Sequence, residues 1–263
     1  MNILSFFPAQ HKYSDLPVRL RQEGQQTLRT LSLIDLDLIE QSLQHNEAAL
    51  LQQVLSVAEQ IYFQRFKYMK RKKEWLGGRI AAKAAILALA SHHAADQNLR
   101  SITILPNKHG RPIAEGFPAN LADRGSGPTI SISHSDCFAV AMAKEASRVR
   151  EGSRASCGVD LQEISTKLAG LTTHFATDAE LQLLAQQAGC DEDTRLTMLW
   201  TVKEALKKSL LHDQSVIFSA TELQEIVVVS DSVQRFTCTV QGEIQSVLVH
   251  PLPPYILSIT EEN

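Results

Sequence analysis

Two stretches of the chain carry residue types that a divalent cation and a phosphate need together. Asp160 follows Gly158-Val159 in a short apolar stretch that predicts a strand. Lys203, Glu204 and Lys208 lie further along, in a stretch that predicts a helix. Carboxylates are the oxygen ligands that Mg²⁺ prefers, and ammonium groups attract phosphoryl oxygens. The two stretches therefore indicate metal-assisted phosphate chemistry.

The predicted strand and helix also say which neighbouring side chains join this chemistry. Side chains alternate along a strand, so Gln162 faces the same side as Asp160 and Glu163 faces the other. Gln162 is therefore the next available metal ligand. Glu204 lies one helical turn after Trp200, on a helix whose apolar residues predict burial. A buried carboxylate is costly without a cation, which favours a functional role over a solvated ion pair.

A second set of polar residues lies in the first half of the chain. Ser133-His134-Ser135-Asp136 contains the residue types of a catalytic triad, but consecutive strand residues point to opposite faces and do not form one. Ser133 and His134 remain hydrogen-bond donors suited to phosphate oxygens. Lys108 and Arg111 lie in a turn predicted by Asn, Gly and Pro, and a guanidinium suits bidentate phosphate contact.

The composition excludes several classes of protein. The chain has 263 residues and a formal charge of −3, which argues against broad nucleic-acid binding. No apolar run approaches the ~20 residues of a membrane span, and the N-terminus does not have the pattern of a signal peptide. The four cysteines have no metal-ligand spacing and predict free thiols in a reducing compartment, the cytoplasm. One basic run stands out as a surface for an acidic partner or as a solvated helix face: Lys67, Lys70, Arg71, Lys72 and Lys73.

The order of predicted elements repeats along the chain. Helical patterns over residues 50–90 precede strands at 101–106, 129–135 and 138–143, and the polar stretch 145–156 is the best candidate hinge. After it come the Asp160 strand, helices over 177–211 and strands in the last 40 residues. We therefore predict an α+β protein of two halves, residues 1–148 and 149–263. Trp75, Arg79 and Lys83 also echo Trp200, Glu204 and Lys208 at the same helical spacing, which favours a duplicated unit with a ligand cleft between the halves.

In this order the motifs resemble the 4′-phosphopantetheinyl transferases of the longer, monomeric, surfactin-synthetase-activating type. The resemblance runs from about Arg65 to Lys208. It is carried by Gly78-Arg79 and Lys83, Gly110-Arg111-Pro112, Ile132-Ser133-His134-Ser135, Gly158-Val159-Asp160, Phe175 with Glu180, and Trp200 with Lys203-Glu204-Ala205 and Lys208. The pairing of Gly-Val-Asp with Trp-x-x-Lys-Glu-Ala-x-x-Lys is its most specific part.

The resemblance implies a role for each matched residue. Asp160 and Glu204 resemble the Mg²⁺ ligands, with Gln162 where many members carry Glu. Lys208 and Lys203 resemble the groups on the coenzyme A diphosphate, and Ser133 and His134 resemble phosphate contacts. Lys108 and Arg111 resemble the turn on the adenosine end, and Arg65 lies near the family's further basic contact.

The implied reaction moves the phosphopantetheine arm of coenzyme A to a serine of an apo acyl or peptidyl carrier protein of fatty-acid or secondary-metabolite synthesis. Asp160, Glu204 and Lys208 would carry the chemistry, and the basic run Lys67–Lys73 would dock the acidic carrier. The implied fold is two similar α/β halves related by a pseudo-twofold, in a monomer. Two alternatives stay open: a non-catalytic module that binds coenzyme A or a carrier protein, and another Mg²⁺-dependent phosphoryl transferase.

Overall fold

A computed structural model describes residues 19–20, 29–90, 98–122, 127–145, 157–187, 189–211 and 218–261. The chain divides into two compact units, Met1–Cys157 (unit 1) and Gly158–Asn263 (unit 2). The predicted boundary between residues 148 and 149 lies outside the described residues, as does all but the first residue of the predicted hinge over 145–156. Within the described residues no helix is long and apolar enough to cross a membrane.

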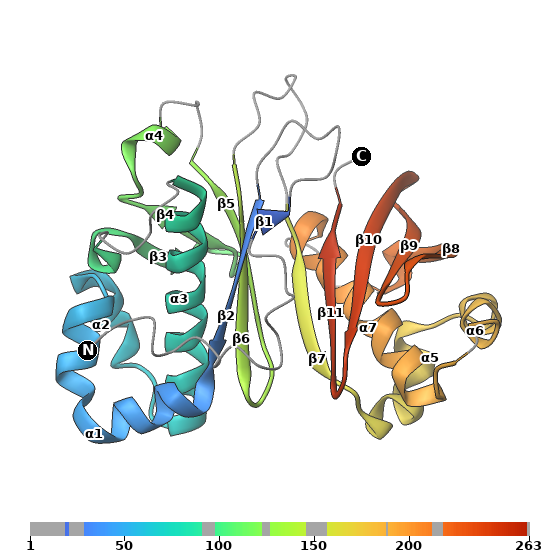
Figure 1. Cartoon of the computed structure of the whole chain (residues 1–263), viewed down its shortest axis with the longest axis horizontal. Helices are drawn as coiled ribbons and strands as arrows, with labels where there is room; N and C mark the ends of the chain where they lie inside the picture. Colours follow the sequence, from blue (N-terminus) through green and yellow to red (C-terminus); the bar gives the residue numbers. More distant parts are fainter. Residues whose placement is uncertain are drawn as a thin grey trace. The chain divides into compact units, whose positions relative to one another are not determined.

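Unit 1 packs one long helix on an antiparallel sheet. The helix is α3 (Met69–Ala90), which lies against β2, β5 and β6 (Figure 1). The sheet has the order β1-β2-β6-β5, with β1 at Arg19–Leu20, β2 at Arg29–Asp35, β5 at Thr129–His134 and β6 at Phe138–Lys144. A Cβ on Gly77 would overlap the side chain of Leu36, so the glycine allows the close approach of α3 at this point.

Two shorter helices complete the core of unit 1. Helix α1 (Leu36–Val54) begins where the Asp35 side chain accepts hydrogen bonds from the backbone N–H groups of the first turn. Helix α2 (Val57–Phe63) begins with a capping box, in which Ser56 and Glu59 each accept from the other's backbone N–H. Glu59 is completely buried, which is unusual for a carboxylate and requires a partner.

A two-stranded hairpin and short helical segments complete the described part of unit 1. The hairpin pairs β3 (Thr103–Pro106) with β4 (Pro112–Glu115), and its turn contains Gly110 at φ +83°. Asn107 stabilises the turn, because its side-chain oxygen accepts from the backbone N–H groups of His109 and Arg111. The short helices are η3 at Leu99–Ser101 and α4 at Ala119–Ala122.

Unit 2 repeats the packing of one long helix on an antiparallel sheet. The helix is α7 (Glu192–Leu210), which lies against β7, β10 and β11 (Figure 1). The sheet has the order β7-β11-β10-β9-β8, with β7 at Val159–Glu163, β8 at Thr221–Ser230, β9 at Val233–Val240, β10 at Glu243–Leu252 and β11 at Tyr255–Thr260. Shorter helices precede α7 or β8: η4 at Thr166–Leu171, α5 at Thr172–Phe175, α6 at Asp178–Ala185 and η5 at Phe218–Ala220.

Trp200 fixes one face of α7 in the core of unit 2. Its ring packs edge-on against Phe175 at a centroid distance of 5.3 Å and is tilted against Phe218 at 5.0 Å. The predicted burial of this helix is therefore confirmed. The predicted mixture of helices and sheets is also confirmed, whereas the pseudo-twofold and the cleft between the halves stay predictions.

Candidate functional site

The candidate site in unit 2 is built where β7 meets α7. Gly158, just before β7, makes this contact possible, because a Cβ there would overlap the backbone carbonyl oxygen of Ala205. The close approach places the end of α7 over the start of β7. As a result the side chain of Asp160, on β7, faces residues that are more than 40 positions away along the chain.

Asp160 and Lys208 form the central contact of this site. Lys208 Nζ lies 2.6 Å from Asp160 Oδ1 and also donates to the backbone oxygen of Val159 at 3.2 Å. The Asp160 side chain is 8% exposed and that of Lys208 26% exposed. A nearly buried carboxylate needs a cation within reach, and Lys208 supplies that charge. The structure thus brings these two predicted site residues together.

Glu204 lies one turn before Lys208 on the same helix face. Its carboxylate is partly exposed and pairs with Lys207, with Nζ 3.3 Å from Oε1. The two side chains are 17% and 34% exposed, so solvent screens this pair in part and it does not commit the carboxylate to a fixed partner. Gln162 lies at the open end of β7 and donates from Nε2 to the backbone oxygen of Glu163 at 3.3 Å. Its side-chain oxygen is the atom that could face a metal ion.

These residues fit a magnesium ion of the kind that shares its ligands with a phosphate. In the described part of the chain, no group of three or more His, Cys, Asp or Glu side chains forms a ready metal site. Mg²⁺ commonly takes only one or two carboxylates and completes its octahedron with water and substrate phosphate oxygens. Asp160 and Glu204, with the amide oxygen of Gln162, supply a donor set of that size.

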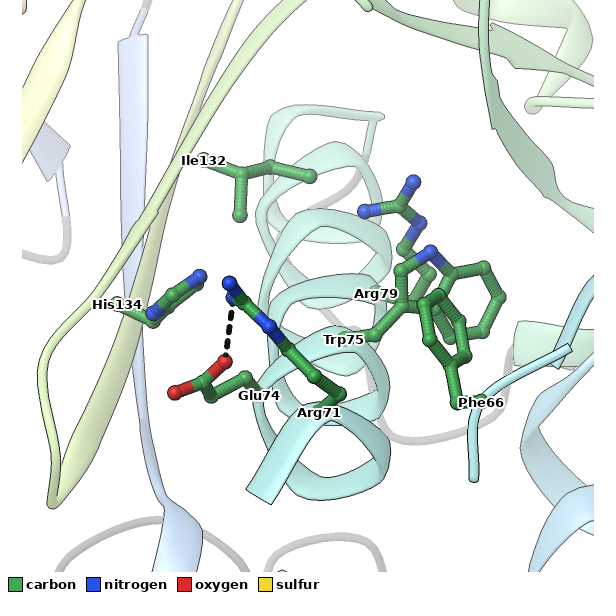
Figure 2. Close-up of a pocket in the computed structure, with 7 residues that line it drawn as sticks. All are labelled: Phe66, Arg71, Glu74, Trp75, Arg79, Ile132 and His134. Carbon is green, nitrogen blue, oxygen red and sulfur yellow. Dashed lines mark hydrogen bonds and ion pairs between the residues drawn. The ribbon is translucent and has the colours of Figure 1, made fainter. Parts of the chain in front are cut away.

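Unit 1 holds a separate pocket of about 190 Å³ between α3 and β5 (Figure 2). In Figure 2 the His134 ring and the Arg71 guanidinium point toward one another, and Arg71 pairs with Glu74 at 2.9 Å. His134 lies at the exposed end of β5, and the preceding Ser133 is buried. The pocket wall also contains Phe66, Trp75, Arg79 and Ile132.

Arg79 is a cation of the pocket wall that the sequence did not predict as a site residue. Its side chain is almost buried, Nε donates to the backbone oxygen of Ile104 at 3.1 Å, and its guanidinium lies 4.5 Å from the Trp75 ring centroid. Burial lowers the pKa of Arg79 to about 10, so the group stays protonated at neutral pH. The Gly78-Arg79 pair belonged to the motif, but nothing in its spacing showed that the guanidinium would line a pocket.

Three predicted coenzyme contacts lie on neighbouring parts of unit 1. Arg65 is exposed and lies 4.8 Å from the ring centroid of Tyr62, which stacks on Trp75 of the pocket wall at 5.6 Å. Lys108 is exposed and Arg111 half-buried in the turn between β3 and β4. Since Arg79 bonds to Ile104 of β3, the hairpin that carries the turn is tied to the helix that carries the pocket.

The basic run Lys67–Lys73, predicted as a docking surface or a solvated helix face, is largely paired within unit 1. Four of its five cations pair with carboxylates of unit 1: Lys70 with Asp136 at 2.8 Å, Arg71 with Glu74 at 2.9 Å, Lys72 with Glu47 at 2.7 Å, and Lys73 with Glu40 at 2.7 Å and Asp37 at 3.3 Å. These pairs cancel most of the positive charge that the sequence suggested. Lys67 is exposed, and within the described residues no ion pair is seen for it.

Comparison with known proteins agrees with the geometry of unit 2. The sequence model of the 4′-phosphopantetheinyl transferase superfamily matches residues 156–259, which include Asp160, Glu204 and Lys208. A holo-[acyl-carrier-protein] synthase from Oceanobacillus iheyensis is 31% identical over 113 residues, which are 42% of this chain and 88% of that protein. The chain belongs to the 4′-phosphopantetheinyl transferase superfamily.

Solved structures of similar proteins align with less than half of this superfamily member. A holo-(acyl-carrier-protein) synthase from Bacillus anthracis, in complex with coenzyme A (3′,5′-ADP), has 25% identity and a TM-score of 0.39, and the alignment covers 45% of this chain and 95% of that one. An acyl carrier protein synthase from Plasmodium yoelii with ADP bound has 20% identity and a TM-score of 0.41, with 46% and 95% covered.

One residue of the superfamily motif has a different setting from the one we expected. Lys203 is 1% exposed, and its Nζ lies 2.7 Å and 2.9 Å from the two carboxylate oxygens of Glu180. A fully buried ammonium held by a fully buried carboxylate does not face solvent or a ligand. The expected contact of Lys203 with the coenzyme A diphosphate is therefore not supported by its geometry, and Lys208 is the lysine that reaches the site.

Proposed function

We propose that the protein transfers the 4′-phosphopantetheine arm of coenzyme A to a serine of an apo carrier protein and releases 3′,5′-ADP. The observation that carries this proposal is the contact of Lys208 with Asp160, with Glu204 one turn away, inside the segment that matches the superfamily. The carrier is an acyl or peptidyl carrier protein of fatty-acid or secondary-metabolite synthesis. The chain acts as a cytoplasmic monomer of the longer type.

Lys208 is suited to hold the diphosphate of coenzyme A. An ammonium group has three N–H donors. Two of them are directed to Asp160 and to the Val159 carbonyl, which leaves the third for a phosphate oxygen in the described part of the site. A cation placed there stabilises negative charge on the leaving phosphate, and this contribution grows as the phosphorus–oxygen bond breaks.

Asp160, Glu204 and Gln162 are the residues that would hold Mg²⁺. When bound, the ion supplies positive charge to the diphosphate oxygens and lowers the cost of the charge that develops there. Lys208 pairs with the nearly buried Asp160 carboxylate before any ion arrives, so this side chain is oriented in advance. This preorganisation lowers the cost of assembling the site when the substrate binds.

The transfer also needs a group that takes the proton of the carrier serine. The serine Oγ forms a bond to the phosphorus nearer the pantetheine, and the bond from that phosphorus to the leaving 3′,5′-ADP breaks. Glu204 is a candidate base, either directly or through a water molecule, because its carboxylate is partly exposed. Asp160 is less suited to this task, since its nearly buried carboxylate is paired with Lys208 through Oδ1.

The pocket of unit 1 and its surroundings are the proposed contacts for the rest of coenzyme A. Ser133, His134 and Arg79 would meet phosphate oxygens, and the pocket volume suits part of a nucleotide. Arg65, Lys108 and Arg111 would add positive charge around the adenosine end. Each of these groups donates hydrogen bonds, which is the requirement for binding an anion of this kind.

We also propose a narrower docking surface for the carrier than the whole basic run. It consists of Lys67, with the exposed cation Lys70 and three exposed apolar side chains, Val57, Ile61 and Tyr68, which are 64%, 60% and 76% exposed. Large apolar side chains this exposed are characteristic of interaction surfaces when they gather beside charges. An acidic carrier helix with an apolar face would match both features.

Intact-mass spectrometry of apo carrier proteins tests the proposed reaction. Incubation with coenzyme A and Mg²⁺ should add one phosphopantetheine arm, and EDTA should abolish the addition. A panel of fatty-acid, polyketide and peptidyl carriers would rank the substrates. If coenzyme A binds but no carrier gains mass, the non-catalytic module becomes the better description.

A further inference from the structure

Each unit contains one buried lysine–glutamate pair, and the two pairs have the same hydrogen-bonding pattern. In unit 1, Lys83 Nζ lies 2.5 Å from Glu59, and both side chains are 0% exposed. In unit 2, Lys203 Nζ lies 2.7 Å from Glu180, and both side chains are 1% exposed. Each lysine lies on the long helix that packs on the sheet of its own unit.

The two glutamates have hydrogen-bonding partners at equivalent places in their units. Each one is the third residue of a short helix and forms its capping box, with Ser56 in unit 1 and Thr177 in unit 2. The carboxylate oxygen not used in the box accepts a backbone N–H from the strand that follows the long helix, Ile104 at 2.9 Å and Leu223 at 2.9 Å. Each pair therefore joins a short helix, a long helix and a strand at one buried point.

A buried pair that is fully hydrogen-bonded holds its elements in one arrangement. Removing either partner leaves a buried charge without compensation, which is far more costly than losing an exposed pair. Such a network therefore resists rotation or sliding of the long helix. The side chains next to the lysine on the helix keep their positions as a consequence.

The two networks stand beside different functional groups. In unit 2 the residue after Lys203 is Glu204, and Lys208 follows on the same helix. In unit 1 the residue after Lys83 is Ala84, but the network contacts Arg79 through Ile104. Glu59 accepts the Ile104 N–H, and the Ile104 carbonyl accepts the N–H of Arg79 at 3.1 Å.

We propose that the two buried pairs are duplicated positioning devices with separate tasks. Glu180–Lys203 sets Glu204 and Lys208 for the transfer step, and Glu59–Lys83 sets Arg79 in the pocket that binds the coenzyme. This inference rests on the proposed function. It assigns Lys203 and Glu180 as positioning residues that contact neither the coenzyme nor the metal.

Matched variants in the two units test this assignment. Lys203→Met and Lys83→Met each remove one buried ammonium, and the double variants Glu180→Gln/Lys203→Met and Glu59→Gln/Lys83→Met remove both charges in case a single variant does not fold. Circular dichroism and thermal melts establish that each variant is folded at the assay temperature. Steady-state kinetics then gives kcat and the KM for coenzyme A.

The expected result is that the two sites affect different kinetic parameters. The unit 2 variants should lower kcat by roughly 10- to 100-fold, because small displacements of reacting groups are costly. They should raise the KM for coenzyme A by no more than about threefold, because Lys208 is only one of its proposed contacts. The unit 1 variants should raise that KM by roughly tenfold and leave kcat within about threefold. Two pairs that only stabilised the fold would change both parameters in the same way, and that result would overturn the proposal.

Calorimetric binding of 3′,5′-ADP tests the positioning role without any transfer. The unit 1 variants should bind 3′,5′-ADP more weakly than wild type. The unit 2 variants should bind 3′,5′-ADP as wild type does, but any increase in affinity caused by Mg²⁺ should require a higher Mg²⁺ concentration. If wild type transfers nothing but these binding differences are found, the proposed function fails and the positioning roles stand. If the variants of both units bind 3′,5′-ADP as wild type does, with the same need for Mg²⁺, the positioning roles of the two buried pairs are wrong.

Discussion

Asp160 and Lys208 form an ion pair at 2.6 Å, so each residue is the partner that the other's charge requires. A change at either position removes more than one hydrogen bond, because the remaining charge loses its partner in a site that is largely closed to water. Isosteric changes separate the chemistry from the packing better than truncation does. Asparagine in place of Asp160 and glutamine in place of Glu204 keep the shapes of these two side chains and remove only their charges.

We expect Asp160→Asn and Glu204→Gln to abolish measurable transfer, a loss of about 10²-fold or more, because the negative charges that would hold the metal and accept the serine proton are removed. Mass spectrometry of the carrier measures the loss, and near-native circular dichroism shows that the fold is kept. Alanine at either position should give the same loss of activity. Robust transfer by any of these four variants would contradict the assignment of the two acids.

The motif residues also show how far the sequence alone could reach. Asp160 and Lys208 were predicted to act together because their residue types and their place on a strand and a helix are specific, and the structure puts them in contact. Lys203 was misjudged, since a lysine beside a glutamate on a helix has the same pattern whether it is exposed or buried. Its partner Glu180 lies on another helix, 23 residues earlier, and no local sequence pattern predicts a pairing over that distance.

At the level of elements, the contact between β7 and α7 depends on the absence of a side chain at Gly158. Gly158→Ala would place a Cβ against the carbonyl oxygen of Ala205, and neither backbone segment has room to move away freely. We expect the free energy of unfolding to fall by about 1–3 kcal/mol, the usual cost of overpacking. Transfer activity should fall as well, because α7 carries Glu204 and Lys208.

Chemical denaturation measures the stability change, and Gly170→Ala is the matched control. Gly170 lies in the same unit, and a Cβ there would meet nothing within 4 Å. The control should therefore keep the stability and activity of the wild-type protein. Equal stabilities of the two variants would show that β7 and α7 are less closely packed than described.

The sequence predicted the positions of the strands better than those of the helices, but it did not predict which strands pair in each sheet. Alternating residues predicted β5. Strands β6 and β11 are buried along almost their whole length, so alternation does not describe them. The echo between the two long helices was predicted in the wrong register. It aligned Lys83 with Lys208, whereas the shared networks align Lys83 with Lys203. Spacing alone cannot distinguish these registers, because both lysines lie on the same helix.

We expect a half-buried histidine on β10, His250, to make the stability of unit 2 depend on pH. Burial lowers the pKa of His250 below its ordinary value of 6.5. The unfolded chain therefore binds more protons than the folded protein as the pH falls below about 6.5, and the free energy of unfolding decreases there. We expect His250→Leu to reduce this acid sensitivity.

Urea denaturation at several pH values between about 7.5 and 5 measures the slope of stability against pH. His174→Gln serves as the control, since the His174 side chain is exposed on α5. The control should leave the slope as in wild type. A slope that is the same in wild type and His250→Leu would show that other groups account for the acid sensitivity.

At the scale of the whole molecule, the net charge of −3 opposes the approach of an acidic carrier. Local positive charge must then compensate at the docking surface, and the ion pairs of Lys72 and Lys73 leave little of it there. Lys67 is the exposed cation of the basic run that we expect to act on the carrier. Lys70 is 65% exposed and adds to it, although it pairs with Asp136.

The double variant Lys67→Glu/Lys70→Glu should raise the KM for the carrier by roughly three- to tenfold at low salt, since exposed charges steer association and are screened at high salt. The KM for coenzyme A should not change, because neither residue belongs to the proposed coenzyme contacts. Lys167→Glu is the control: it reverses an exposed charge in unit 2 and should leave both constants unchanged. A carrier KM that is insensitive both to salt and to the double variant would mean that the carrier docks on another surface, and the exposed apolar residues Val57, Ile61 and Tyr68 would then lose their proposed role as well.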